Sequence, residues 1–316
     1  MDVTDPTQLL RQVRLALQNG HYAEAAGYLQ QAAELARQAG DSAAEARHLG
    51  NLALIVHQRL NRPEQALVYL EQALVSARDA GDRLTEDGLL GNMGNILREL
   101  GRHDDAVNRL NEALLIAQEE GDARGRGIWL SNLGLVYDDL GQSEQAIELH
   151  KESVAVARSL YDQRGLAARL NHLGDSYLTA LQPTEALKCF HEAVAVLKDI
   201  GDLPAAAQRM SAIGAILSDL GRVAPSDFEA HLYFDLALDA YRDALAMFRE
   251  LNDVLAEAET LSSMGNVFGN LGYYDPAIAH FNAAYTLFES LNQRDQLPYL
   301  LQNIELATAY RDGLKP

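Results

Sequence analysis

His172 and Asp175 are the two side chains of this sequence whose types and spacing come nearest to a metal site, because residues three apart share one face of a helix. The motifs that would extend such a pair into a catalytic centre are missing: there is no HExxH, no P-loop, no GxSxG and no zinc-like Cys/His spacing. A solvated or peptide-contacting pair is the simpler interpretation. The sequence predicts no enzyme activity, no metal and no cofactor.

Composition narrows the class of protein. The 26 Lys and Arg against 45 Asp and Glu give a net charge of −19, which argues against nucleic-acid binding. No apolar run reaches the roughly 20 residues of a membrane span, and the acidic N-terminus lacks a signal-peptide core. Cys189 is the single cysteine, and its neighbours Leu187 and Phe190 indicate a buried small hydrophobe. We therefore expect a cytoplasmic protein without membrane or nucleic-acid partners.

A repeat of about 40 residues organises the chain. Aspartates recur with gaps of 41, 40, 40, 40, 51 and 42 at Asp41, Asp82, Asp122, Asp162, Asp202, Asp253 and Asp295. A fixed period of this size is typical of a solenoid, in which each unit is too small to bury its own core and stacks on its neighbours.

Each repeat predicts two helices, and the first carries large apolar residues at i, i+3 and i+7 beside a glycine that lets another helix approach closely. The five clearest segments centre on Gly94, Gly134, Gly174, Gly214 and Gly265. That approach must outweigh the roughly 1 kcal/mol that glycine costs within a helix. We expect these helices to end at left-handed glycines, namely Gly101, Gly141, Gly221 and Gly272.

The second helix of each repeat carries small residues seven apart with a bulky one between, typically Leu110, Phe190, Tyr241 or Phe281. The small pairs are Ala25/Ala32, Ala66/Ala73, Ala106/Ala113, Ala146/Ser153, Ala186/Ala193, Ala237/Ala244 and Ala277/Ala284. We expect these helices to end at Gly40, Gly81, Gly121 and Gly201, with the following Asp capping the next helix.

This pattern resembles the tetratricopeptide repeat, W-x2-L-G-x2-Y…A-x3-F…P, across about residues 20–295. Leu or Met replaces the Trp, the final Pro is missing, and the period is about 40 rather than 34, which helices of about 17–18 residues explain. Long repeats of this kind are similar to those of Pins-type scaffolds, kinesin light chains, and MalT-like and Rap-like regulators. The stretch Gly91-Asn92-Met93-Gly94-Asn95 is close to the first of these. The resemblance implies an all-α, right-handed superhelix whose first helices line a concave groove.

The resemblance also implies which residues face that groove. They are Asn92, Asn95, Arg98, Glu99, Ser131, Asn132, Asp138, Asp139, Asn171, His172, Asp175, Thr179, Gln208, Ser211, Ser218, Asp219, Glu259, Ser262, Ser263, Asn266 and Asn270. Asparagine is a poor mid-helix residue, so its recurrence needs a reason. The amides either hold the backbone of an extended peptide, or they tie one first helix to the next or are simply solvated, and both interpretations stay open. The excess of carboxylates, expected to be solvated, predicts a neutral to basic peptide.

The 51-residue gap predicts an insertion between Gly221 and Ala237. Ser226 and Glu229 form a capping-box pattern, so a helix should run from there to about Glu250. We expect this helix to project past the stack and present Phe228, His231, Tyr233 and Phe234. These aromatics form either a second contact surface, with Phe228, Tyr233 and Phe234 as its centre, or a packing layer on adjacent helix ends.

The predicted fold is a single all-α solenoid of seven helix pairs over residues 1–316. Its repeats span about 6–40, 41–81, 82–121, 122–161, 162–201, 202–252 and 253–294, followed by a capping helix at 296–312 with the apolar residues Leu297, Leu300, Leu301, Ile304 and Tyr310. The predicted function is a non-enzymatic scaffold that binds an extended peptide or a partner helix in the groove. The alternative is a regulator controlled by a small ligand or signal peptide, as in MalT-like and Rap-like proteins.

Overall fold

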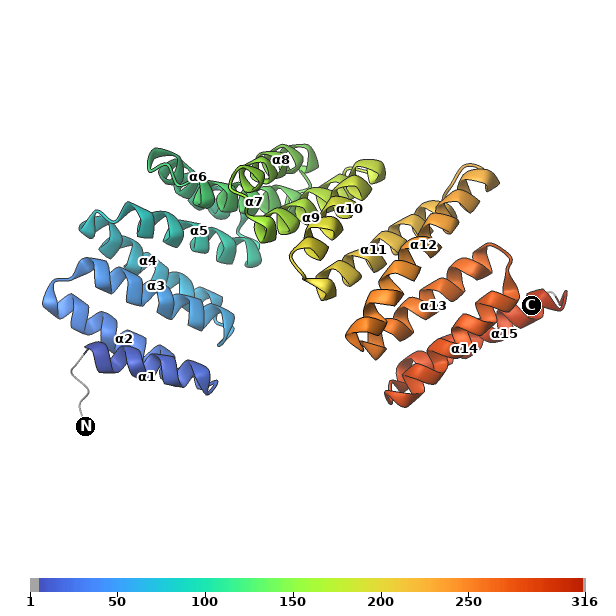
Figure 1. Ribbon diagram of the computed structural model, residues 1–316. Helices are drawn as coiled ribbons and strands as arrows, with labels where there is room; N and C mark the ends of the chain where they lie inside the picture. Colours follow the sequence, from blue (N-terminus) through green and yellow to red (C-terminus); the bar gives the residue numbers. More distant parts are fainter. Residues whose placement is uncertain (1–5, 315–316) are drawn as a thin grey trace. The chain divides into compact units, whose positions relative to one another are not determined.

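The computed structural model describes residues 6–314, which are folded into α-helices joined by short turns (Figure 1). The helices are α1 (Pro6–Gln18), α2 (Tyr22–Ala39), α3 (Ser42–Gln58), α4 (Pro63–Ala80), α5 (Arg83–Glu99), α6 (His103–Glu119), α7 (Ala123–Asp139), α8 (Ser143–Ser159), α9 (Gln163–Thr179), α10 (Pro183–Asp199), α11 (Leu203–Arg222), α12 (Asp227–Leu251), α13 (Val254–Asn270), α14 (Tyr274–Ser290), η1 (Arg294–Gln296) and α15 (Leu297–Arg311). This order confirms an all-α solenoid of helix pairs with a final single helix.

The helices belong to two compact units, one ending at Asp162 and the other beginning at Gln163. The first unit holds four pairs, α1 to α8, drawn from blue to green in Figure 1. The second holds three pairs, α9 to α14, with α15 packed on α14. In each unit most helices contact their hairpin partner more than the neighbouring pair, whereas α2 contacts α3 about as much as α1. One superhelix running through the whole chain stays a prediction.

Glycines on first helices receive bulky side chains from second helices, as the sequence pattern predicts. A β-carbon at Gly94 would lie 2.5 Å from Leu110, and one at Gly265 would lie 2.6 Å from Phe281. Ala106 and Ala113 flank Leu110 and are fully buried. Each of these glycines has only a hydrogen atom where the bulky side chain packs. Any larger residue in its place would push the two helices of the pair apart.

Helix ends follow the predicted chemistry at most positions. The carboxylates of Asp41, Asp82, Asp122, Asp202 and Asp253 accept hydrogen bonds from backbone N–H groups three residues later, at 2.9–3.3 Å. The predicted terminating glycines have positive φ, for example +72° at Gly101 and +75° at Gly201. Gly221 is the exception. It lies inside α11, is buried, and has no positive φ, so its prediction as a helix end is wrong.

The insertion lengthens both helices of one pair. α11 has 20 residues and α12 has 25, against 17 in most other helices. Ser226 accepts a hydrogen bond from the N–H of Glu229 at 3.2 Å, and its hydroxyl donates to the Glu229 carboxylate at 3.1 Å, which confirms Ser226 as the cap of a continuous helix. Because α11 also continues, the first turns of α12 have a helix to pack on. A β-carbon at Gly221 would lie 2.7 Å from the ring of Phe234.

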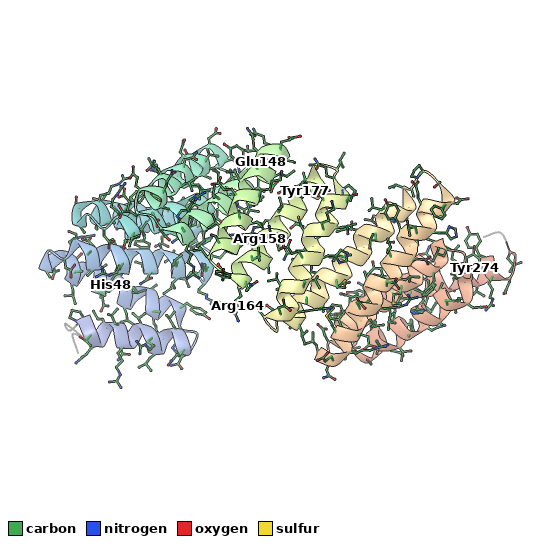
Figure 2. All side chains as sticks on the ribbon, turned by 45° about the horizontal axis from the view of Figure 1, so that its top comes forward. His48, Glu148, Arg158, Arg164, Tyr177 and Tyr274 are labelled. Carbon is green, nitrogen blue, oxygen red and sulfur yellow. The ribbon has the colours of Figure 1, made fainter. Side chains whose placement is uncertain are left out.

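Helix α15 covers the last pair. Leu300 is fully buried and Ala307 nearly so, while Tyr310 stacks on Tyr274, labelled in Figure 2, with ring centroids 5.6 Å apart. Leu301 is 45% exposed and Tyr310 48% exposed. Of the five apolar residues of the predicted capping helix, Leu301 and Tyr310 are therefore about half exposed and cover the last pair less than Leu300 does.

Two other sequence expectations have structural counterparts. Cys189 is buried within α10, as its neighbours indicate. Between residues 6 and 314, none of the helices combines the length and apolar character that crossing a bilayer requires.

Candidate functional site

Three amides of the first unit occupy the face predicted to bind peptide. Asn92 and Asn95 lie on α5, and Asn132 occupies on α7 the position that Asn92 occupies on α5. All three are partly buried. Their side chains make no hydrogen bond to any other group within residues 6–314. Each amide offers one acceptor and two donors, so the unit presents unused hydrogen-bonding capacity from two successive first helices.

Charged side chains of the same face behave differently, because they connect successive first helices. Arg98 of α5 donates to Asp139 of α7 at 2.9 Å. His57 of α3 lies 2.6 Å from Glu99 of α5. The sequence left open whether the amides of this face bind a peptide, tie helices together or are solvated. The charges tie helix to helix, whereas the amides are left available.

Asp138 is a correction to the expectation of solvated carboxylates. Its carboxylate lies 3.2 Å from Nε2 of His150, a fully buried histidine of α8. His150 occupies the position that Leu110 fills in the preceding pair, and a β-carbon at Gly134 would lie 2.6 Å from its ring. The sequence analysis missed His150. Its signal was a polar residue at a position otherwise held by Leu, Phe or Tyr.

In the second unit, two residues of α9 that were predicted to face the groove, Asn171 and Asp175, also contact the protein itself. Asp175 pairs with Arg209 of α11 at 3.5 Å, and that guanidinium lies 4.6 Å over the ring of Phe190. Asn171 buries its amide oxygen without a hydrogen-bond partner among the described residues. No group of three or more His, Cys, Asp or Glu side chains within residues 6–314 is arranged to hold a metal, so His172 and Asp175 have no third ligand there.

A polar cleft of about 310 Å³ lies where α11 and α13 meet α15. Ser218 and Asp219 line one side, and Ser263, Asn266 and Asn270 line the other. The hydroxyl of Tyr299 donates to Asn266 at 3.2 Å, so α15 supplies part of the wall. Tyr241 contributes a nearly buried ring, and this burial raises the pKa of its hydroxyl, opposed in part by a hydrogen bond with Ser263. The sequence predicted Asn266 here but gave no sign that α15 reaches it.

Two larger clefts lie between second helices of the first unit. One, of about 530 Å³, is lined mainly by α6 with Leu67 and Glu71 of α4. The other, of about 640 Å³, is lined mainly by α2 with Tyr69 and Gln72 of α4. Arginines in these walls are already paired, as Arg102 is with Asp105 at 2.6 Å. The larger clefts of the first unit therefore lie on the second helices and not on the predicted face of the first helices. The arginines that line them are already paired with carboxylates.

The predicted second contact surface divides between core and solvent. Phe228 is 79% exposed, whereas Phe234 is 5% exposed and packs on Gly221. Tyr233 is partly buried against the core of the second unit. The expectation that Phe234 is an exposed contact residue is wrong, because the lengthened α11 covers it.

The first unit matches a known protein family. The family model described as tetratricopeptide repeat matches residues 8–79 and 86–159. The first unit is a tetratricopeptide repeat array. The matched segments lie in the first unit, and the second unit repeats the same glycine, alanine and bulky-residue packing.

Solved structures share the fold at low sequence identity. BtubC (BKLC) from P. vanneervenii is 20% identical with a TM-score of 0.60, covering 77% of this chain and 92% of its own. The apo form of RapI is 13% identical with a TM-score of 0.62, covering 91% and 99%. A Rap protein complexed with Competence and Sporulation Factor is 13% identical with a TM-score of 0.52, covering 96% and 98%. A comparison with curated protein sequences gives no match.

Proposed function

We propose that this protein is a cytoplasmic interaction scaffold that binds an extended peptide segment along its first helices. The observation that carries the proposal is the set Asn92, Asn95 and Asn132, partly buried and without side-chain hydrogen bonds within residues 6–314. An extended peptide backbone supplies a donor and an acceptor at each residue, which matches an amide that can do both.

The pairing of the charges supports a neutral to basic ligand with a modest electrostatic contribution. Arg98 donates to Asp139, and Glu99 hydrogen-bonds with His57, so both side chains are already engaged by a neighbouring first helix. The net charge of −19 remains a general attraction for basic segments. Hydrogen bonds from the amides would then supply most of the specificity, and catalysis forms no part of the proposal.

The second candidate is a regulator controlled by a signal peptide or small effector. It is favoured by the likeness to RapI and to the Rap protein complexed with Competence and Sporulation Factor, which spans nearly all of this chain. In that case ligand binding would alter the activity of another protein. The cleft beside Asn266 and Tyr299 is one place in the second unit where a small polar effector would fit.

A peptide array followed by binding kinetics tests the proposal. The variant Asn92→Ala/Asn132→Ala should weaken the selected peptide by about 1–3 kcal/mol, the cost of unpaired hydrogen-bonding groups at a binding surface. The matched control is Asn108→Ala/Asn111→Ala, two exposed asparagines on the second helix α6, which should bind as the parent does. Equal loss in both variants, or a co-purified small molecule in place of any peptide, would contradict the scaffold.

A further inference from the structure

The lengthened N-terminal part of α12 is an ordered helical extension that packs on the core of the second unit. In the other second helices the first alanine of the small pair stands near the helix start, whereas α12 begins at Asp227 and reaches Ala237 only after further turns. Phe234 locks these turns to Gly221 of α11, and Ala230 and Tyr233 also contact the core. The outer face of this segment is therefore held in place by the fold.

That outer face carries an apolar stripe. Phe228, Leu232 and Leu236 follow each other at i, i+4 and i+8, so they lie along one side of the helix. They are 79%, 49% and 43% exposed, and Val223 in the preceding turn is 78% exposed. The other second helices of this unit, α10 and α14, expose no large hydrophobic side chain in their described residues. Within the second unit, the stripe is thus found on this second helix and not on the other two.

Uncompensated negative charge surrounds the stripe. Asp235, Asp239 and Asp243 advance along the same exposed side, and Glu229 stands near its start. Asp239 is paired with Arg242 at 2.6 Å, but Asp235 and Asp243 form no ion pair within the described part of the chain. An apolar contact bordered by unpaired carboxylates is complementary to an apolar contact bordered by cations.

We propose that the stripe of Phe228, Leu232 and Leu236 is a docking site for a basic amphipathic helix of a partner protein, separate from the peptide site on the first helices. The partner's apolar face covers the stripe, and its Lys or Arg side chains reach Asp235 and Asp243. An anionic lipid surface is repelled by the same carboxylates. A second copy of this chain would bring like charges together, so it is disfavoured as the occupant.

Three synthetic peptides of about 18 residues, long enough to be helical when docked, test the charge requirement. They share one leucine face and carry Lys, Gln or Glu on the flanks. In fluorescence anisotropy with the full-length protein, the Lys peptide should bind at least about tenfold more tightly than the Glu peptide. Because the whole protein is acidic, variants must then locate the site.

Phe228→Ser/Leu232→Ser should weaken the Lys peptide by at least about tenfold, the size of an apolar anchor. Asp235→Asn/Asp243→Asn should reduce the salt dependence of its association. The matched control is Val75→Ser/Leu115→Ser, which removes two side chains of the first unit that are 60% and 57% exposed and should change nothing. Circular dichroism melts confirm that each variant is folded.

Equal binding of the Lys and Glu peptides, or unchanged binding to Phe228→Ser/Leu232→Ser, overturns the proposal. So does a concentration-dependent dimer that this variant abolishes, because the occupant would then be a second copy. Asn92→Ala/Asn132→Ala should leave the Lys peptide bound as before, which separates failure of the stripe from failure of the peptide site.

Discussion

Gly174 of α9 lies directly against the ring of Phe190 of α10, and a β-carbon at Gly174 would stand 2.3 Å from Cε1 of that ring. Phe190 is fully buried, so its ring has no free direction in which to move. The same relationship joins Gly214 to Tyr241 in the next pair, at 2.8 Å. The distance between the helices of a pair is thus set by an absent side chain on one helix and a large one on the other.

Gly174→Ala should therefore destabilise the second unit by about 1–3 kcal/mol, the usual cost of overpacking a filled core. Gly269→Ala is the control, because Gly269 lies in α13 and a β-carbon there would have no neighbouring atom within 4 Å. That variant should gain up to about 1 kcal/mol from helix propensity. Urea unfolding of both proteins measures the difference, and a neutral or stabilising Gly174→Ala would contradict this account of the packing.

The sequence predicted these contacts because they depend on residues that recur at one spacing in every repeat. Gly221 shows the limit. A glycine that ends a helix cannot be distinguished in the sequence from a glycine that makes room for an aromatic ring. At Gly221 the second role follows only from the position of Phe234 on the next helix. Phe234 was expected at the surface because the sequence did not show that α11 continues far enough to cover its ring.

The sequence predicted which residues share the face of the candidate site, but it did not predict the hydrogen bonds that those residues make. Asn92 and Asn132 recur 40 residues apart, so their shared face follows from the period. The bonds from Arg98 to Asp139 and from His57 to Glu99 cross between repeats through long side chains, whose directions depend on packing. The two pairs do occupy equivalent positions of successive repeats, because His57 and Arg98 are 41 residues apart and Glu99 and Asp139 are 40 apart. The residue types differ between the two repeats, so the correspondence is harder to recognise than that of the asparagines.

The two phenylalanines of the α12 extension should differ in their effect on stability. Phe234→Ala removes a ring that is 5% exposed and should cost about 3–5 kcal/mol, as large-to-small changes in a core do. Phe228→Ala removes one that is 79% exposed and should stay within about 0.5 kcal/mol. Chemical denaturation measures both. Similar losses would show that the tip of the extension packs as tightly as its middle.

Leu300 and Leu301 provide an equivalent pair in α15. Leu300 is fully buried, so Leu300→Ala should cost about 2–5 kcal/mol, whereas Leu301 is 45% exposed and Leu301→Ala should cost little.

Deleting residues 297–316 should expose the apolar face of the last pair and promote association. Calorimetry and light scattering test this, and a truncated protein that stays monomeric with an unchanged Tm would refute the capping role.

Asp87 should make stability depend on pH. It is 4% exposed at the contact of α5 with α7, and burial, reinforced by the charge of Asp122, raises its pKa to about 6 from an ordinary value of 3.8. A carboxyl whose pKa is raised by folding contributes stability while protonated, and this is lost as pH rises through about 6. Asp87→Asn should therefore be more stable than the parent at pH 7–8, by about 1–2 kcal/mol.

The advantage of Asp87→Asn should shrink as the pH falls from about 7 to about 4, because the parent carboxyl becomes neutral as well. Asp79→Asn, an exposed aspartate of α4, is the matched control and should show no such trend. Urea midpoints across this pH range decide the matter. A constant difference between Asp87→Asn and the parent would mean that folding does not shift the pKa of Asp87.

Binding kinetics should separate the amides from the charges of the predicted peptide site. Asn132→Ala removes a side chain without intramolecular hydrogen bonds, so it should speed dissociation of a selected peptide and leave the salt dependence of association unchanged. Asp139→Asn removes the partner of Arg98 and leaves that guanidinium uncompensated, 29% exposed. Association of a basic peptide should then slow, most visibly at low salt. Asp138→Asn is unsuitable for this comparison, because Asp138 also contacts the buried His150 and its loss would disturb the core. A salt-sensitive change in Asn132→Ala, or none in Asp139→Asn, would show that charges and amides do not divide the work in this way.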